Sequence, residues 1–94
     1  MAARIVLKDK QVAADGTTVE RVVYQLPAPT RERPHGLKYR LYCGRKGRCL
    51  VRYDNETGQG DHVHYGDRER VYRFVSLEQF LRDFERDVRR LTGG

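Results

Sequence analysis

The sequence lacks a long apolar run and has few cysteines, and both absences exclude classes of protein. No stretch reaches the roughly 18 consecutive apolar residues that a membrane-spanning helix needs, so we expect no membrane segment. The opening residues MAARIVLKDKQVAADG have neither the apolar core nor the cleavage site of a secretory signal, which predicts a cytoplasmic protein. Cys43 and Cys49 are too few for a disulfide scaffold, or for a zinc site made of cysteines alone.

Positive charge, by contrast, is abundant. Nineteen basic residues stand against thirteen acidic ones, for a formal net charge of +6 over 94 residues, and fifteen of the nineteen are arginine. Arginine binds phosphate through a planar fork and stacks on bases, although a GC-rich genome would also enrich it. We predict a single domain, residues 1–94, with an anionic partner that is either nucleic acid or an acidic protein.

Alternating apolar and polar residues predict an antiparallel sheet of about five strands. The expected strands cover residues 3–8, 18–27, 37–43, 49–54 and 70–75. Asp15-Gly16 is a strong hairpin-turn signal, and a three-residue turn at 45–47 would place Cys43 opposite Cys49. That pairing would permit a disulfide, although a cytosolic setting favours two reduced, buried thiols.

This register divides the third and fourth strands between two faces. One face is largely apolar and should contact the core; it carries Leu37, Tyr39, Leu41, Cys43, Cys49, Val51 and Tyr53. The other face is cationic and carries Lys38, Arg40, Tyr42, Leu50, Arg52 and Asp54. A slip of one residue would bury Arg40 and Arg52 at high cost, so we expect the cationic face to stay open.

The last nineteen residues predict an amphipathic helix. Ser76 is the expected N-cap, Gln79 occupies the capping-box position and Gly93 can end the helix. Its apolar stripe at helical spacing contains Leu77, Phe80, Leu81, Phe84, Val88 and Leu91. We therefore predict an α+β fold in which this C-terminal helix packs on one face of the sheet and its charged residues are solvated.

Histidine is scarce, and two of the three histidines lie in one polar segment, YDNETGQGDHVHYGD at 53–67. His62 and His64 are two residues apart, so they point the same way if the segment is extended. The hairpin register brings His35 near the start of the segment. A turn with solvent-exposed histidines would also account for this composition without any activity.

Metal-independent RNA cleavage is one activity that fits these residues, because it needs a base, an acid and cations around the phosphorane. The catalytic candidates, with His35 in reserve and Asp54 as an orienting carboxylate, are His62, His64, His35 and Asp54. The nucleic-acid-binding candidates, which would hold phosphate or stack a base, are Lys38, Arg40, Arg52, Tyr42 and Tyr65.

Two alternatives stay open. Asp54, Asp61, His62 and His64 are plausible ligands for metal-dependent hydrolysis, but their spacing matches no metal motif, so we expect no metal and no other cofactor. The basic face could also bind nucleic acid or an acidic partner without any chemistry.

Several motifs resemble the TumE family of small prokaryotic toxins. They run from QLP at 25–27 through PHG and KYRLY to RYDNE, GDH, GDRE and SLE, and cover about Gln25 to Asp87, with YDNETGQGDHVH the most specific part. Phe80 stands where an aliphatic residue is expected. The resemblance implies the toxin component of a type II toxin–antitoxin system, neutralised by a helix-turn-helix antitoxin.

The family supplies no catalytic residues to carry over. Other small endoribonuclease toxins also combine a compact sheet with helices, although their helices usually come first in the chain. We therefore expect a cytoplasmic toxin that cleaves RNA, with no membrane partner. An exposed sheet edge would allow a homodimer through strand pairing.

Overall fold

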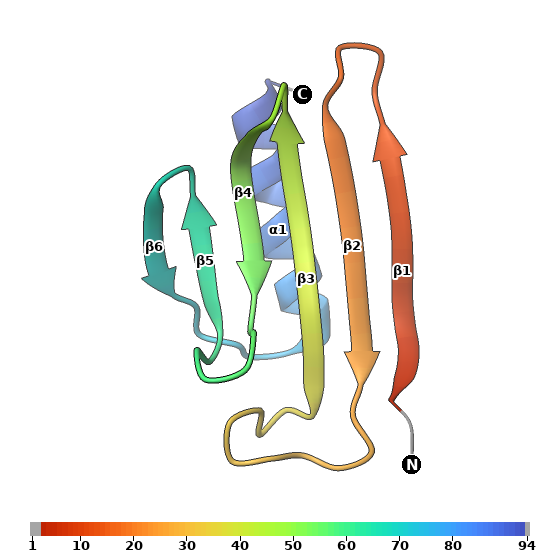
Figure 1. The fold of residues 1–94 in the computed structure, drawn as a ribbon, viewed down its shortest axis with the longest axis vertical. Helices are drawn as coiled ribbons and strands as arrows, with labels where there is room; N and C mark the ends of the chain where they lie inside the picture. Colours follow the sequence, from red (N-terminus) through yellow and green to blue (C-terminus); the bar gives the residue numbers. More distant parts are fainter. Residues whose placement is uncertain (1–2, 94) are drawn as a thin grey trace.

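A computed structural model describes residues 3–93, and it shows one antiparallel sheet with one helix packed on one face, running roughly along the strands (Figure 1). The six strands lie in sequence order, each pairing with the next. The elements are β1 (Arg4–Val12), β2 (Thr18–Gln25), β3 (Leu37–Arg45), β4 (Arg48–Asp54), β5 (His62–Tyr65), β6 (Arg68–Val71) and α1 (Leu77–Thr92). The α+β prediction is confirmed, with six strands instead of about five. Within residues 3–93, no helix has the length and apolarity needed to cross a membrane.

The additional strand lies inside the polar segment 53–67, where none of the five expected strands extends beyond residue 54. Residues 62–65 form β5, and Gly66-Asp67 turn the chain into β6. Gly66 has a φ of 60°, a conformation that tight hairpin turns require and that glycine adopts without strain. The strand predicted at 70–75 was wrong in its limits, because β6 ends at Val71. Beyond it the Tyr72 N–H donates to the Asp61 carbonyl at 3.0 Å, and residues 73–75 lead to the helix outside any strand.

The predicted register of β3 and β4 was also wrong, because the strands are joined by a two-residue turn and contain a bulge. Lys46 and Gly47 form the turn, both with positive φ, and Cys43 pairs with Val51 instead of Cys49. Leu50 is the extra residue of the bulge and packs against the core. The net shift is two residues, so the two faces keep the predicted side chains except at the bulge.

The bulge also separates the two cysteines. Cys43 is buried in the core, whereas Cys49 pairs with Gly44 and lies near the charges of Arg52 and Arg40. Both are free thiols, and burial raises the pKa of each. The thiolate that disulfide exchange requires is therefore disfavoured at both positions.

The core forms between α1 and one face of the sheet, as the apolar stripe predicted. Ser76 caps the helix by accepting a hydrogen bond from the backbone N–H of Gln79, and Gly93 ends it with a φ of 77°. Phe80 and Phe84 are the helix residues buried most completely among the apolar ones. They pack against a set of buried sheet residues that comprises Val23, Tyr39, Leu41, Cys43, Val51, Tyr53 and Val63.

One charged helix residue lies in this interface, contrary to the prediction that the helix charges are solvated. Asp87 is only 2% exposed and accepts hydrogen bonds from the hydroxyls of Tyr53, at 2.5 Å, and Tyr65, at 2.6 Å. Burial and the carboxylate beside them raise the pKa of both tyrosines, so both hydroxyls keep their protons. Asp87 therefore connects the helix to β4 and β5.

Candidate active site on the open face of the sheet

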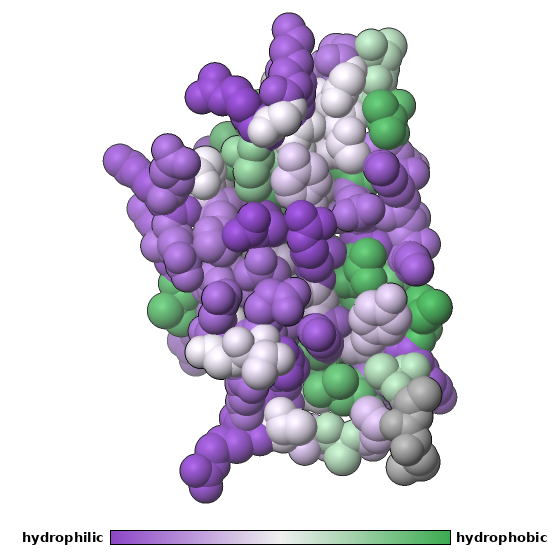
Figure 2. Space-filling view, in the orientation of Figure 1, coloured by the Kyte–Doolittle hydropathy of each residue, from purple (hydrophilic) through white to green (hydrophobic). Residues whose placement is uncertain are grey.

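The face of the sheet that α1 does not cover is here called the open face. Figure 2 shows that hydrophilic side chains cover its centre and its β5–β6 side, whereas apolar side chains gather mainly over β1 and β2. Strand alternation places on it, from β3 to β5, Lys38, Arg40, Tyr42, Arg52, Asp54, His62 and His64. Seven of the nine predicted site residues thus share one face.

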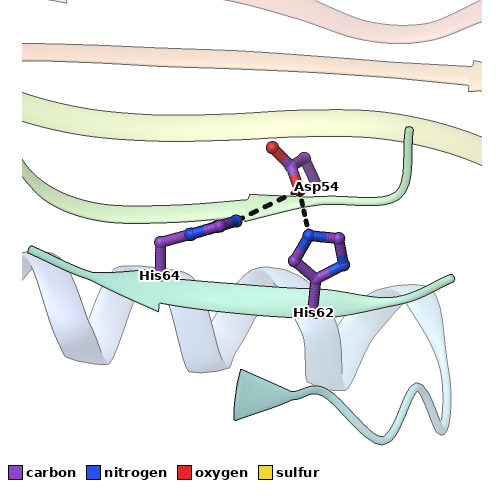
Figure 3. A group of neighbouring side chains, drawn as sticks. All are labelled: Asp54, His62 and His64. Atoms are coloured by element: carbon purple, nitrogen blue, oxygen red, sulfur yellow. Dashed lines mark ion pairs between the residues drawn. The ribbon is translucent and has the colours of Figure 1, made fainter. Parts of the chain in front are cut away.

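Three of these residues form a compact cluster at the junction of β4 and β5 (Figure 3). Asp54 is the last residue of β4 and pairs with His62, while Arg52 pairs with His64. One oxygen of Asp54, Oδ1, lies 3.1 Å from Nε2 of His62 and 3.7 Å from Nε2 of His64. Because β5 is extended, both imidazoles point toward the same carboxylate. These residues are called the Asp54–His62–His64 cluster below.

The cluster is largely buried, and the polar atoms that face one another in it lack hydrogen bonds of good geometry within residues 3–93. Asp54 is 5% exposed and His62 is 3% exposed. Among the described residues, Asp54 Oδ1, His62 Nε2 and His64 Nε2 are buried atoms without a hydrogen-bond partner of good geometry. Buried polar groups are nearly always satisfied in folded proteins, so such a group calls for a functional explanation.

The tautomer of His62 follows from its other ring nitrogen. Nδ1 lies 2.9 Å from the backbone carbonyl oxygen of Gly60, which can only accept a hydrogen bond. Nδ1 therefore carries a proton and donates it. Nε2 then faces Asp54 either as a free lone pair or with a second proton, which are the two states that acid–base chemistry uses.

Arg52 fixes the orientation of the carboxylate. Its Nε donates to Asp54 Oδ2 at 2.8 Å, leaving Oδ1 to face the histidines. This bond uses one of the five N–H donors of the guanidinium. Arg40, one strand away, pairs with Glu20 at 3.0 Å and lies over the ring of Tyr42. Arg52 is therefore the cation most closely tied to the cluster.

The segment that leads from Asp54 to His62 is held by polar contacts instead of apolar ones. The Asn55 side chain is fully buried, accepts from the backbone N–H of Tyr39 and donates to the carbonyl of Leu37, so it extends the pairing of β3 beyond the end of β4. Arg33 donates to the backbone carbonyl of Asn55 at 2.7 Å. These bonds position the cluster without any apolar anchor in the segment.

His35 does not join the cluster. It lies on the helix-covered face, with its ring 4.1 Å from that of Phe74, and its Nε2 lies 2.9 Å from Asp61. The backbone N–H of Leu37 donates to its Nδ1, so Nε2 is the protonated nitrogen and donates to the carboxylate. The predicted closeness of His35 to the polar segment is thus correct, but the sheet separates it from His62 and His64.

Tyr65 also lies on the helix-covered face. Its hydroxyl is bonded to Asp87, and the Arg90 guanidinium lies over its ring. Lys38 and Tyr42 do lie on the open face. Of the two predicted base-stacking tyrosines, only Tyr42 therefore shares a face with the cluster.

Glu69 is a further residue at the cluster that was not predicted from the sequence. It lies on β6 opposite His64, and one of its carboxylate oxygens is 3.4 Å from Nε2 of His62. Its side chain is 59% exposed. The signal that could have found it is Gly66-Asp67, a two-residue turn pair between HVHY and RERV that predicts a hairpin and hence this register.

Taken together, these features define a small α+β protein with a buried acid–base cluster on a cationic sheet face. The model of the family described as Toxin TumE matches residues 2–92. The chain therefore belongs to the TumE toxin family, and the resemblance noted in its motifs is confirmed. No curated protein and no solved structure matches the chain.

Proposed function

We propose that this toxin cleaves RNA phosphodiester bonds without a metal ion, at the Asp54–His62–His64 cluster. The observation that carries the proposal is the convergence of two imidazole Nε2 atoms on one carboxylate oxygen, at 3.1 and 3.7 Å. Imidazole gains and loses a proton near neutral pH, so two of them can serve as a base and an acid in one reaction. Membership of a toxin family supports a harmful activity of this kind.

In the proposed reaction, the phosphorus of one RNA linkage exchanges its bond to the 5′-oxygen for a bond to the neighbouring 2′-oxygen of the same RNA strand. His64 removes the proton of the 2′-hydroxyl, the 2′-oxygen bonds to the adjacent phosphorus, and the bond from phosphorus to the 5′-oxygen breaks. His62, whose Nε2 lies 3.1 Å from Asp54 Oδ1, donates its proton to the departing 5′-oxygen. The products are a 2′,3′-cyclic phosphate and a 5′-hydroxyl. Arg52 would stabilise the negative charge on the phosphorane.

Access to His62 depends on its neighbour in β6. Glu69 lies against Nε2 of His62 but is largely exposed, so its side chain can rotate into solvent without disturbing the core. A phosphate group would repel the Glu69 carboxylate and attract Arg52. Substrate binding therefore favours the rotamer that opens the cluster.

The proposal is tested with purified protein that has been treated with EDTA and incubated with a single-stranded RNA. We expect cleavage in EDTA that leaves cyclic phosphate ends, and no cleavage at a site whose 2′-hydroxyl has been replaced by hydrogen. Cleavage that requires an added metal ion would instead indicate metal-dependent hydrolysis. Tight binding of the RNA without cleavage in either condition would indicate a non-catalytic binding module.

Arg52→Gln should weaken RNA binding in a salt-dependent way. Each phosphate contact to a single strand contributes about 0.7 to the slope of log affinity against log salt concentration, so losing one should lower the slope by about that amount. The measurement uses RNA with 2′-O-methyl groups, which this reaction cannot cleave. Arg82→Gln is the matched control, because Arg82 is exposed on α1, on the far side of the sheet. Equal slopes for the two variants would contradict a phosphate-binding role of Arg52.

The partner proposed for this toxin is an antitoxin of the helix-turn-helix class, in a type II system in which protein binds protein. Toxin-family membership supports an antitoxin partner. Its substrate would place the toxin in the cytoplasm. The edge strand β1 is also open to pairing with a second copy, which would give a homodimer. Co-expression with the protein encoded by the neighbouring gene, followed by gel filtration, would show whether the two co-purify and whether the free toxin is a dimer.

A further inference from the structure

We infer that the Asp54–His62–His64 cluster is also a binding site for a divalent transition-metal ion of the Zn²⁺ class, and that the bound ion inhibits the toxin. The binding itself is argued from the geometry alone. The inhibition rests on the proposed function, because it is the acid–base role of the two histidines that the ion would abolish.

The spacing of the three donor atoms suits such an ion. Asp54 Oδ1 is 3.1 Å from His62 Nε2 and 3.7 Å from His64 Nε2, and one ligand atom from each residue lies within 4.8 Å of the others. A tetrahedral Zn²⁺ with bonds of about 2.0–2.2 Å would hold its donors about 3.3–3.5 Å apart. The two distances to Asp54 Oδ1 lie within about 0.4 Å of these separations, and the two imidazoles, whose ligand atoms lie within 4.8 Å of each other, would draw together around the ion.

The surrounding hydrogen bonds prepare the donors for a cation. The Nδ1–H of His62 donates to the Gly60 carbonyl, which turns the Nε2 lone pair toward Asp54. Arg52 donates to the other oxygen of Asp54 and so fixes the direction of Oδ1. Metal-binding histidines and carboxylates almost always have such outer partners, which set the tautomer and the orientation of the ligand.

The unsatisfied atoms distinguish this cluster from the second histidine–carboxylate pair of the protein. Asp61 accepts from His35, Tyr39 and Asn55, so its oxygens have partners. In the cluster, a carboxylate oxygen and two ring nitrogens face one another, and none of the three has a hydrogen-bond partner of good geometry among residues 3–93. A proton satisfies part of this arrangement, and a divalent cation satisfies all of it at once.

The donor set indicates both the kind of ion and its effect. Two imidazoles and a carboxylate suit Zn²⁺ and neighbouring transition metals better than Mg²⁺ or Ca²⁺, which prefer oxygen ligands. Glu69 lies 3.4 Å from His62 Nε2 and can supply a fourth donor. Four protein ligands would close the coordination sphere and leave no position for phosphate, as in structural zinc sites. The ion would thus occupy the lone pairs that catalysis needs.

The test begins with protein stripped of metal by a chelator, which is then removed, and titrated with ZnCl₂ by calorimetry. We expect one ion per chain and a higher Tm in the presence of Zn²⁺. Glu69→Gln should weaken binding about tenfold, and His64→Ala should weaken it at least about a hundredfold. The matched control is His35→Gln, which removes a histidine from the other face and should bind as the wild type does. Equal affinity for all four proteins, or no saturable binding, would overturn the site.

A parallel cleavage assay tests the inhibition. RNA cleavage should fall in proportion to the Zn²⁺ occupancy measured by calorimetry, and EDTA should restore it. An increase in cleavage with Zn²⁺ would overturn the inhibition and favour a catalytic metal. Absence of cleavage in metal-free protein would count against the proposed function, while the calorimetric result on the site would stand unchanged.

Discussion

Replacing His62 with alanine will lower the rate of RNA cleavage at least about 10²-fold, the usual loss when a general acid or base is removed. The variant will also fail to arrest growth when it is induced in cells. The physical reason is the position of the His62 ring, whose Nε2 lies 3.1 Å from Asp54 and is the nitrogen able to pass a proton to a leaving group. Single-turnover cleavage of a labelled RNA measures the rate, and a growth curve after induction measures the arrest.

His35→Ala is the control for this experiment. His35 also pairs with a carboxylate at 2.9 Å, but it does so on the helix-covered face. This variant should lose some stability and keep its cleavage rate per folded molecule. Circular dichroism and Tm would show that both variants are folded. A folded His62→Ala protein that cleaves RNA at the wild-type rate would rule out the proposed acid–base role.

Replacing Asp87 with alanine will lower the free energy of unfolding by about 2–5 kcal/mol, because each buried hydroxyl left without an acceptor costs about 1–3 kcal/mol. The change would leave the hydroxyls of Tyr53 and Tyr65 inside the helix–sheet interface without their acceptor. Small domains have a total stability of only about 5–15 kcal/mol, so much of the variant would be unfolded under mild denaturing conditions. Urea denaturation followed by circular dichroism gives the value.

Glu85→Ala is the control, because Glu85 lies on the same helix but is exposed. Its effect should stay within about 0.5 kcal/mol. Asp87→Asn keeps one oxygen that can accept a hydrogen bond, so it should fall between the two. If Asp87→Ala were no more destabilising than Glu85→Ala, the tyrosine hydroxyls would have to be satisfied by water.

The faces of the sheet could be predicted from the sequence because they depend on a simple alternation. The register could not, since the bulge at Leu50 and the two-residue turn at Lys46-Gly47 shift the pairing without changing which residues are apolar. The predicted turn was wrong, but the resulting shift is an even number of residues. Because side chains alternate with a period of two along a strand, an even shift leaves each one on its predicted face. Only Cys49 and Leu50, at the bulge, lie on faces opposite to those predicted.

Asp87 shows a signal that was present and overlooked. It lies three residues after Phe84 and four before Leu91, so helical spacing places it on the apolar stripe. Charged residues are seldom buried, and this general expectation outweighed the spacing. Asp87 is an exception because Tyr53 of β4 and Tyr65 of β5 donate hydrogen bonds to it. Both tyrosines are far from Asp87 in the sequence, so the contact could not be predicted from local spacing.

The candidate site was predictable in part. The HVH spacing predicts that His62 and His64 share a direction, and the end of β4 predicts where Asp54 points. The cluster itself depends on β5 pairing with β4, and a strand of four residues is too short for periodicity to reveal. His35 lies in the turns at 26–36, where the alternation of a strand does not apply. Its side of the sheet is therefore set by tertiary packing alone.

The order of the elements also has a consequence for synthesis of the toxin. Every strand pairs with its neighbour in sequence, so the contacts within the sheet are local and can form quickly as the chain leaves the ribosome. The strands that carry the cluster emerge first, but Phe80 and Phe84, which bury the other face of those strands, emerge last. Until α1 has been synthesised, the apolar face of the sheet has no helix to pack against and the core cannot form. Interruption of translation before the helix would therefore yield a chain with every residue of the cluster and no stable fold to hold them together.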